Sequence, residues 1–328
     1  MPVLRLAGKR EGLAPNSPQV SMAVPVSRLN ADIALLLAAA IWGIAFVFQK
    51  SAMDHVGPLA FIAARSLVAA LALAPLALRE HRQVTASARA GFWLVASGGG
   101  LAFFIAAWLQ QEGLRTATVT NGSFLTALYV ILTPFVAWGW SGKVPNPIVW
   151  PAVALSALGT WLLGGGSLGA FSHGDLLVAL SAFFWAVHVV TTGRASRFGR
   201  PIGFTALQFA AVTVLAVAGA AAFETTTLAG LAGAAIDIAY LGLLSSALCF
   251  TVLTVALQYT APSEAALIVS MDTVFAALAA YLVLGERLTA LGWAGAALIL
   301  TATLLLQVGA ARGWRWRNGS AGRIRRQP

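Results

Sequence analysis

Ten apolar runs, each long enough to cross a lipid bilayer as a helix, follow one another along this chain with short loops between them. A bilayer core of about 30 Å requires about 20 helical residues. Only helices and closed barrels satisfy their backbone polar groups inside lipid, and these runs lack the alternating pattern of barrel strands. The sequence therefore predicts an all-α integral membrane protein with ten transmembrane helices. The runs lie at 31–49, 58–78, 91–111, 116–138, 147–164, 173–192, 201–223, 233–257, 262–284 and 290–309.

Composition excludes an ordinary soluble domain. Hydrophobic residues make up 59% of the chain and charged residues 10%, with a mean hydropathy of +0.81, whereas soluble domains carry about 25% charged residues. The net charge of +10 comes from short loops and the two ends, not from one groove-binding face, so we expect no nucleic-acid partner. No GxxxxGK[ST] motif or His/Asp/Glu cluster occurs, so we expect no ATP site, no metal, no cofactor and no enzymatic activity.

The basic residues predict the orientation. An even number of spans places both termini on one side, and most Lys and Arg residues fall in the loops on that side, against Lys50, Arg115 and Arg287 on the other. The positive-inside rule therefore predicts cytoplasmic termini in the cytoplasmic (inner) membrane of a bacterium. Residues 1–30 are expected to form an N-terminal tail whose translation start is Met1 or Met22. Residues 310–328 are expected to form a basic tail against anionic lipid.

The two halves of the sequence resemble each other at a constant offset of 143 residues, which divides the chain into repeats at 31–165 and 173–309. Because each repeat has five spans, the second must insert upside down relative to the first. Inverted repeats are an architecture of secondary transporters, whose substrate sites lie near the midplane between the halves. The landmarks that coincide are Asp32 and Asp175, Trp42 and Trp185, Pro58 and Pro201, Phe61 and Phe204, Leu114 and Leu257, Trp150 and Trp293, and Thr160 and Thr303.

The segments LQQEGLRTATVTNGSFLTALYVILTPFVAW (109–138) and ALQYTAPSEAALIVSMDTVFAALAAYLVLGERLT (256–289) resemble the fourth and ninth helices of EamA-domain proteins, in the drug/metabolite transporter superfamily. The resemblance covers about residues 31–308. The family pattern usually has Glu-Pro where this chain has Asp272-Thr273, which keeps the carboxylate but removes a helix-kinking proline. The resemblance implies export or exchange of small metabolites, often amino acids or related compounds. Glu286 and Arg287 belong to the part of the sequence that marks the family. We expect them to lie at a helix end and not in the transport site.

Asp272 is the principal candidate for transport, because it lies about ten residues into the ninth run, roughly 15 Å deep. An ionised carboxylate at that depth must face a cavity, find a partner or take up a proton. The alternative is an interhelical hydrogen bond that only stabilises packing. The 143-residue shift makes Tyr129 its symmetry mate. Tyr129 shares a polar stripe with Thr126, which either lines the same cavity or bonds back to its own helix, and Asn121 is a further cavity candidate.

Arg65 and Gln208 also coincide under the shift, each seven residues after its matching proline. A matched polar position in both halves favours a cavity, where Arg65 would clamp a substrate carboxylate or pair with a helix carboxylate. Snorkelling of Arg65 to the membrane surface is the alternative.

Trp42 and Trp185 are expected to close the cavity, to stack on a substrate cation or simply to pack. His188 is expected either to relay protons or to form an ordinary hydrogen bond.

The leading hypothesis is a secondary transporter of small polar metabolites that works as an exporter, with protons as a candidate coupling ion. An uncoupled facilitator or antiporter, a membrane scaffold or sensor, and a membrane enzyme are the alternatives. The expected partners are a small-molecule substrate and the lipid bilayer. The chain is expected to be a monomer or a homodimer.

Overall fold

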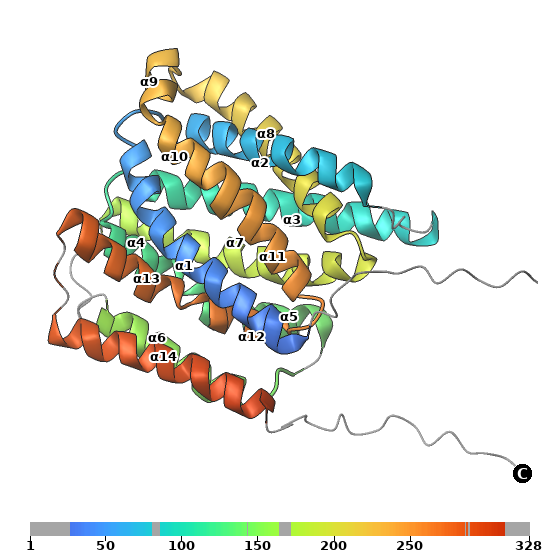
Figure 1. Cartoon of the computed structure of the whole chain (residues 1–328), viewed down its shortest axis with the longest axis vertical. Helices are drawn as coiled ribbons and strands as arrows, with labels where there is room; N and C mark the ends of the chain where they lie inside the picture. The colour runs from blue at the N-terminus through green and yellow to red at the C-terminus, as the bar shows by residue number, and fades with distance from the viewer. Residues whose placement is uncertain are drawn as a thin grey trace, which may run out of the picture.

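The computed structural model describes residues 27–80, 86–142, 144–163, 172–285, 287 and 289–311, and every regular element among them is a helix (Figure 1). The predicted all-α class agrees with this part of the chain. Most of the two predicted tails, and Glu286, lie outside the described residues, whereas Arg287 is described and exposed.

The first half runs from α1 to α6 and the second from α7 to α14. The first contains α1 (Arg28–Ala52), α2 (Pro58–Arg79), α3 (Ala86–Gly113), α4 (Val119–Thr126), α5 (Tyr129–Ser141) and α6 (Val149–Leu163). The second contains α7 (His173–Ala195), the 3-10 turn η1 (Ser196–Phe198), α8 (Pro201–Phe223), α9 (Leu228–Gly233), α10 (Ala235–Ala239), the π-helix η2 (Tyr240–Leu248), α11 (Cys249–Ala256), α12 (Pro262–Val269), α13 (Asp272–Ala279), the π-helix η3 (Ala280–Leu284) and α14 (Ala290–Ala311).

Eight of the predicted spans form helical stretches of 22 to 26 residues that are long and apolar enough to cross a membrane. The fifth and tenth predicted spans correspond to shorter apolar helices in the described residues, Val149–Leu162 and Ala290–Leu305. The structure thus supports a multi-pass membrane protein. A full set of ten crossings stays a prediction.

The helices α2 and α8, which are equivalent under the 143-residue shift, lie side by side along one edge of the bundle (Figure 1). The Glu224 carboxylate after the end of α8 accepts hydrogen bonds from Leu59 N and Ala60 N at the start of α2, at 2.8 and 2.9 Å. The Glu80 carboxylate after the end of α2 accepts one from Gly203 N at the start of α8, at 2.8 Å. The two helices therefore run antiparallel, as inverted repeats require.

The helices α6 and α14 form the opposite edge of the bundle (Figure 1). Their backbones approach so closely that a Cβ atom on Gly159 would lie 2.7 Å from Gly295 O. Between the two edges, α1 packs against α11, α12 and α13, and α7 packs against α3, α4 and α5. These two sets of neighbours are equivalent under the shift, so the packing repeats along with the sequence.

The fourth and ninth spans are each broken near their middle. The fourth separates into α4 and α5 at 127–128, and the ninth into α12 and α13 at 270–271. In the ninth, Ser270 Oγ donates to Leu267 O at 2.7 Å and Thr273 Oγ1 to Ser270 O at 2.8 Å. The two hydroxyls bond to carbonyls at the break, where Ser270 O also accepts from Thr273 N at 3.2 Å. The ninth helix is thus interrupted although Thr273 stands where the family pattern has proline.

Candidate substrate cavity

A cavity lies in the middle of the bundle, at the boundary between the two halves. The cavity has a volume of ≈ 80 Å³. One water molecule needs roughly 10–15 Å³ of such volume, so several waters or a small organic molecule would fit. The walls come from both halves of the chain, and they consist of Trp42, Phe46, Gln49, Arg65, Gln110, Thr126, Tyr129, Trp185, His188, Val189, Ser245, Phe250, Leu253, Ala266, Val269 and Asp272.

The lining of the cavity repeats the internal symmetry of the sequence. Five pairs of wall residues are related by the 143-residue shift, so the cavity lies across the pseudo-twofold relation between the halves. In an inverted-repeat transporter this is where a substrate meets both halves at once. The pairs are Trp42 and Trp185, Phe46 and Val189, Gln110 and Leu253, Thr126 and Val269, and Tyr129 and Asp272.

Asp272 and Tyr129 begin the second segments of the two broken spans, α13 and α5. Both line the cavity and both are buried, Asp272 at 6% exposure and Tyr129 at 5%. Tyr129 Oη lies 3.3 Å from the Ala266 carbonyl of α12, to which it donates across the boundary between the halves. Asp272 forms no ion pair with any described residue. At the helix break, the first half thus carries the Tyr129 hydroxyl, which is bonded to protein. The second half carries the Asp272 carboxylate, which faces the cavity.

Arg65 is a buried cation without a counter-ion in the described part of the chain. It lies on α2, is 5% exposed and lines the cavity, and no described residue forms a hydrogen bond with its Nε atom. Its guanidinium carbon lies 5.8 Å from the centroid of the Phe61 ring. The predicted pairing with a helix carboxylate is therefore absent here, and burial argues against snorkelling to the surface. A guanidinium that is buried in a low-dielectric site without a partner has a high desolvation cost, which an anionic ligand would offset.

The two symmetry-related tryptophans each bond across the boundary between the halves. Trp42 Nε1 donates to Ser245 O in the π-helix η2 at 2.9 Å, and Trp185 Nε1 donates to Gln110 Oε1 on α3 at 2.6 Å. Phe250 packs between them, with its ring centroid 5.0 Å from that of Trp42 and 6.1 Å from that of Trp185. The cavity therefore has an aromatic wall that contacts both halves.

His188 lines the cavity, whereas Gln208 lies behind its wall. His188 is 1% exposed, its Nε2 is 3.2 Å from Thr192 Oγ1, and its Nδ1 has no hydrogen-bond partner among the described residues. Gln208 is 2% exposed and lies beside His188. Arg65 and Gln208 are equivalent under the shift, but Arg65 lies in the wall and Gln208 lies behind it, against the wall residue His188.

Seven of the nine predicted residues line the cavity, namely Trp42, Arg65, Thr126, Tyr129, Trp185, His188 and Asp272. Thr126 Oγ1 also bonds back to Gly122 O at 2.7 Å, so both interpretations of this threonine hold together. Asn121 is not in the wall. It lies in the first turn of α4, where its backbone N–H donates to the capping Thr118 Oγ1, and that position is nearer the helix end than the cavity.

Five polar or aromatic wall residues did not follow from the sequence: Phe46, Gln49, Gln110, Ser245 and Phe250. The sequence could have identified the two glutamines, because a side-chain amide inside an apolar run needs a hydrogen-bond partner there. Phe46, Ser245 and Phe250 carry no such signal. Ser245 reaches the wall through the π-helix of η2, and such helices are often found at functional sites.

The fold and the cavity define a multi-pass membrane protein of the transporter type, in which two related halves enclose a polar cavity. Comparison with known proteins agrees with this class. The sequence pattern of the EamA-like transporter family matches residues 29–165 and again residues 172–308. The chain belongs to the EamA-like transporter family.

Two relatives come from Archaeoglobus fulgidus, and each is described as an uncharacterized transporter. One is 33% identical over 292 residues, which cover 86% of this chain and 87% of the relative. The other is 28% identical over 280 residues, which cover 79% and 91%. A solved crystal structure with 18% identity has a TM-score of 0.70 over 87% of this chain and 99% of its own, and it shows the fold alone. The family and the relatives point to a transporter rather than an enzyme.

Proposed function

We propose that this protein is a secondary transporter that exports small polar metabolites, amino acids or related compounds, in exchange for protons. The observation that carries the proposal is the occurrence of Asp272 and Arg65 in the wall of one cavity between the halves, as two buried opposite charges that form no ion pair with any described residue. Charged groups inside a membrane protein are costly, and they mark substrate and ion pathways.

The cavity is suited to a zwitterion. Arg65 presents planar N–H donors that match a carboxylate. Asp272 offers an acceptor for an ammonium group, and the Trp42 and Trp185 rings add an apolar wall that also attracts cations. The remaining wall is apolar enough to accommodate a small side chain. A metabolite with both charges would replace the missing partner of each wall residue.

The same carboxylate supplies a means of coupling. Asp272 is able to hold a proton or a substrate ammonium group, but not both at once. If the halves expose the cavity alternately to the two sides, each cycle carries a proton one way and substrate the other. A proton gradient directed inward then drives the substrate outward.

Reconstituted protein provides the test. Proteoliposomes loaded with labelled amino acids should release them faster when the proton gradient is imposed, and the gradient should have little effect in Asp272→Asn. Asp54→Asn, which alters an exposed carboxylate in the α1–α2 loop, is the matched control and should retain coupling. Coupled transport that persists in Asp272→Asn would disprove the role of this carboxylate.

An uncoupled facilitator or antiporter is the second candidate, because Arg65 balances the charge of Asp272 within the same cavity. In that case no proton is needed for electrical neutrality. Counterflow of labelled against unlabelled substrate at equal pH would be fast, and a pH gradient would move no net substrate.

A further inference from the structure

The end of the bundle where α1 and α12 begin is held by an ionic cluster that joins the two halves. Arg28 Nη2, at the start of α1, lies 2.7 Å from Glu264 Oε2 in the first turn of α12. Arg28 Nε lies 3.6 Å from Asp32 Oδ2, one turn further along α1. Thr260 Oγ1, in the loop before α12, donates to Asp32 Oδ1 at 2.8 Å.

These contacts are more buried than ordinary surface ion pairs. The Asp32 side chain is 4% exposed and the Glu264 side chain 12%, whereas Arg28 reaches solvent at 40%. Exposed ion pairs contribute little to stability, whereas the loss of one partner of a buried pair leaves an uncompensated charge and is strongly destabilising. Both cross-links, Arg28 to Glu264 and Asp32 to Thr260, connect the first repeat to the second. They therefore resist separation of the halves at this end.

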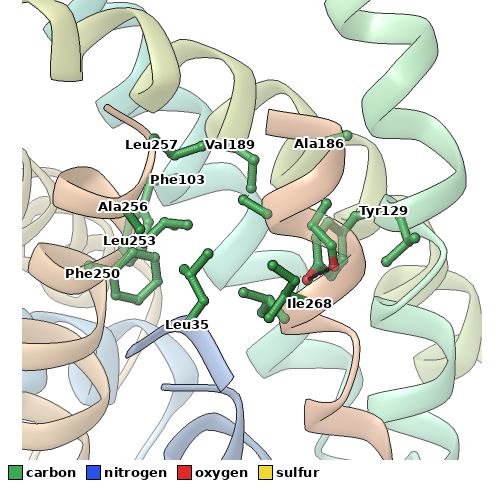
Figure 2. Packing of buried hydrophobic residues seen from close by; sticks show 14 of the residues in the cluster. Leu35, Phe103, Tyr129, Ala186, Val189, Phe250, Leu253, Ala256, Leu257 and Ile268 are labelled. Carbon is green, nitrogen blue, oxygen red and sulfur yellow. Dashed lines mark hydrogen bonds between the residues drawn. The ribbon is translucent and has the colours of Figure 1, made fainter. Parts of the chain in front are cut away.

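The cluster lies close to the cavity along the axis of α12. Ala266 of α12 is in the cavity wall only two residues beyond Glu264, about 3 Å along the helix axis. Leu35, one turn beyond Asp32 on α1, packs with Leu253 and Ile268 in one buried apolar cluster (Figure 2), and Leu253 also lines the cavity. An opening between α1 and α12 at this end would have to separate these side chains and break the ionic cluster.

The other end of the bundle has no equivalent cluster by sequence. Under the 143-residue shift, Glu264 corresponds to Asn121, Thr260 to Ala117 and Arg28 to a phenylalanine. Asp32 does have an equivalent, Asp175, but that carboxylate caps its own helix through Ser172. This four-residue arrangement is thus found at one end, whereas at the other end the Glu224 carboxylate of the second half bonds to Leu59 N and Ala60 N of the first.

We propose that Arg28, Asp32, Thr260 and Glu264 form a gate that closes the cavity on the side where α1 begins. This inference rests on the proposed transport function. The gate stabilises the form of the protein that is closed on this side, and each cycle must break it before the cavity opens there. The four residues act by holding the halves together and contact no substrate in the cavity.

Accessibility of the cavity from each side tests the gate without the need for a substrate. Cys249 is the single cysteine of the chain, so Cys249→Ala combined with Val269→Cys places one thiol in the cavity wall. Membrane-impermeant thiol reagents are applied to sealed vesicles from the side of the N-terminus or from the opposite side. We expect Arg28→Gln and Glu264→Gln to raise the labelling rate from the N-terminal side about tenfold, through a shift of the open population, and not from the other side.

Three further variants separate loss of the gate from a general change in the labelling rate. Thr260→Val removes one hydrogen bond with little change of shape and should give a smaller increase, and Arg28→Lys should restore most of the closure. Glu112→Gln is the matched control, because it breaks the exposed Arg115–Glu112 pair of 2.9 Å, which lies within one half. It should leave the labelling rate unchanged.

A bifunctional thiol reagent provides the converse experiment. Arg28→Cys with Glu264→Cys, in the Cys249→Ala background without the cavity cysteine, should lose flux when the two thiols are bridged and regain it on reduction. Unchanged labelling in folded Arg28→Gln and Glu264→Gln, with transport intact, would overturn the gate and leave the proposed function standing. Altered labelling in a protein that transports nothing would support the gate and contradict the proposed function.

Discussion

The two halves of this protein share a backbone plan but differ in charge at the positions that meet in the middle. Their equivalent helices pack with equivalent neighbours, and their fourth helices break at equivalent residues. Yet Tyr129 of the first half corresponds to Asp272 of the second, and Arg65 of the first corresponds to Gln208 of the second. The symmetric scaffold provides the cavity, and the asymmetric residues give it two opposite charges.

This difference indicates that each half contributes a different charge to the cavity. A fully symmetric cavity would carry two carboxylates or two tyrosines at the helix breaks, and either two guanidinium groups or none. The observed arrangement instead assigns the anion to the second half and the cation to the first. Exchanging residues between equivalent positions is therefore the most direct way to test what each contributes.

The largest effect is expected when the carboxylate is removed. Asp272→Asn keeps the shape of the side chain but eliminates the acceptor for a proton or an ammonium group, so we expect at least a 100-fold loss of coupled transport, or about 2.7 kcal/mol. Tyr129→Phe at the equivalent position removes one hydrogen bond of 3.3 Å to Ala266 O, and we expect a loss of less than tenfold. Initial rates in proteoliposomes measure both. Equal losses would contradict the assignment of the carboxylate as the special partner.

Arg65→Gln makes the first half match the second and should have the next largest effect. The substitution removes a buried charge that has no counter-ion among the described residues, so we expect weaker substrate binding by about tenfold to 100-fold, seen as a higher KM. The folded protein should be at least as stable, because an unpaired buried charge is lost. Gln208→Asn behind the wall is the control and should change KM by less than threefold. A large loss of stability in Arg65→Gln would instead assign the arginine a structural role.

Much of this arrangement follows from the sequence because it depends on simple regularities. Apolar runs of bilayer length predict the helices, and the matched Trp and Pro residues predict two related halves. The same shift identifies Tyr129 and Asp272 as equivalents, and both lie in the cavity wall. These predictions succeed because lipid constrains helix length and because a repeated sequence implies repeated packing.

Other features depend on local geometry that no periodicity encodes. The break at 270–271 lies where the Ser270 and Thr273 hydroxyls bond to backbone carbonyls, and no proline lies at 127–128 or at 270–271. The π-helix η2 turns Ser245 toward Trp42. Asn121 and Gln208 were predicted in the cavity because polarity shows that a residue needs a partner. Polarity alone does not show whether that partner is a ligand or a neighbouring side chain.

A third comparison concerns how closely the first span of each half approaches the broken span beside it. A Cβ atom on Gly43 would lie 2.6 Å from Asp272 O and 2.8 Å from Ala276 N, whereas the equivalent residue of the second half is already alanine, Ala186. Gly43→Ala must therefore force α1 away from α13, and we expect a destabilisation of about 1–3 kcal/mol together with reduced transport. Thermal unfolding in detergent measures it. Ala186→Gly should cost only about 1 kcal/mol, so an equal effect of the two changes would contradict the closer approach at Gly43.

The smallest effect is expected at the two glutamates that cap α2 and α8. Glu224 accepts two short bonds, from Leu59 N and Ala60 N at 2.8 and 2.9 Å, whereas Glu80 accepts one at 2.8 Å and a longer one from Ile202 N at 3.4 Å. An anion at a helix N-terminus is also favoured by the helix dipole. We expect Glu224→Gln to destabilise the protein by about 1 kcal/mol and Glu80→Gln by about half as much.

The double variant sharpens this last comparison. The two caps lie at opposite ends of an antiparallel helix pair, separated by about 30 Å for helices of this length, so their effects on unfolding should add. Additive losses with unchanged KM would show that the caps only hold α2 and α8 together. A raised KM in Glu224→Gln alone would mean that the caps also determine the position of Arg65 in the cavity, since α2 carries that residue two turns beyond its capped end.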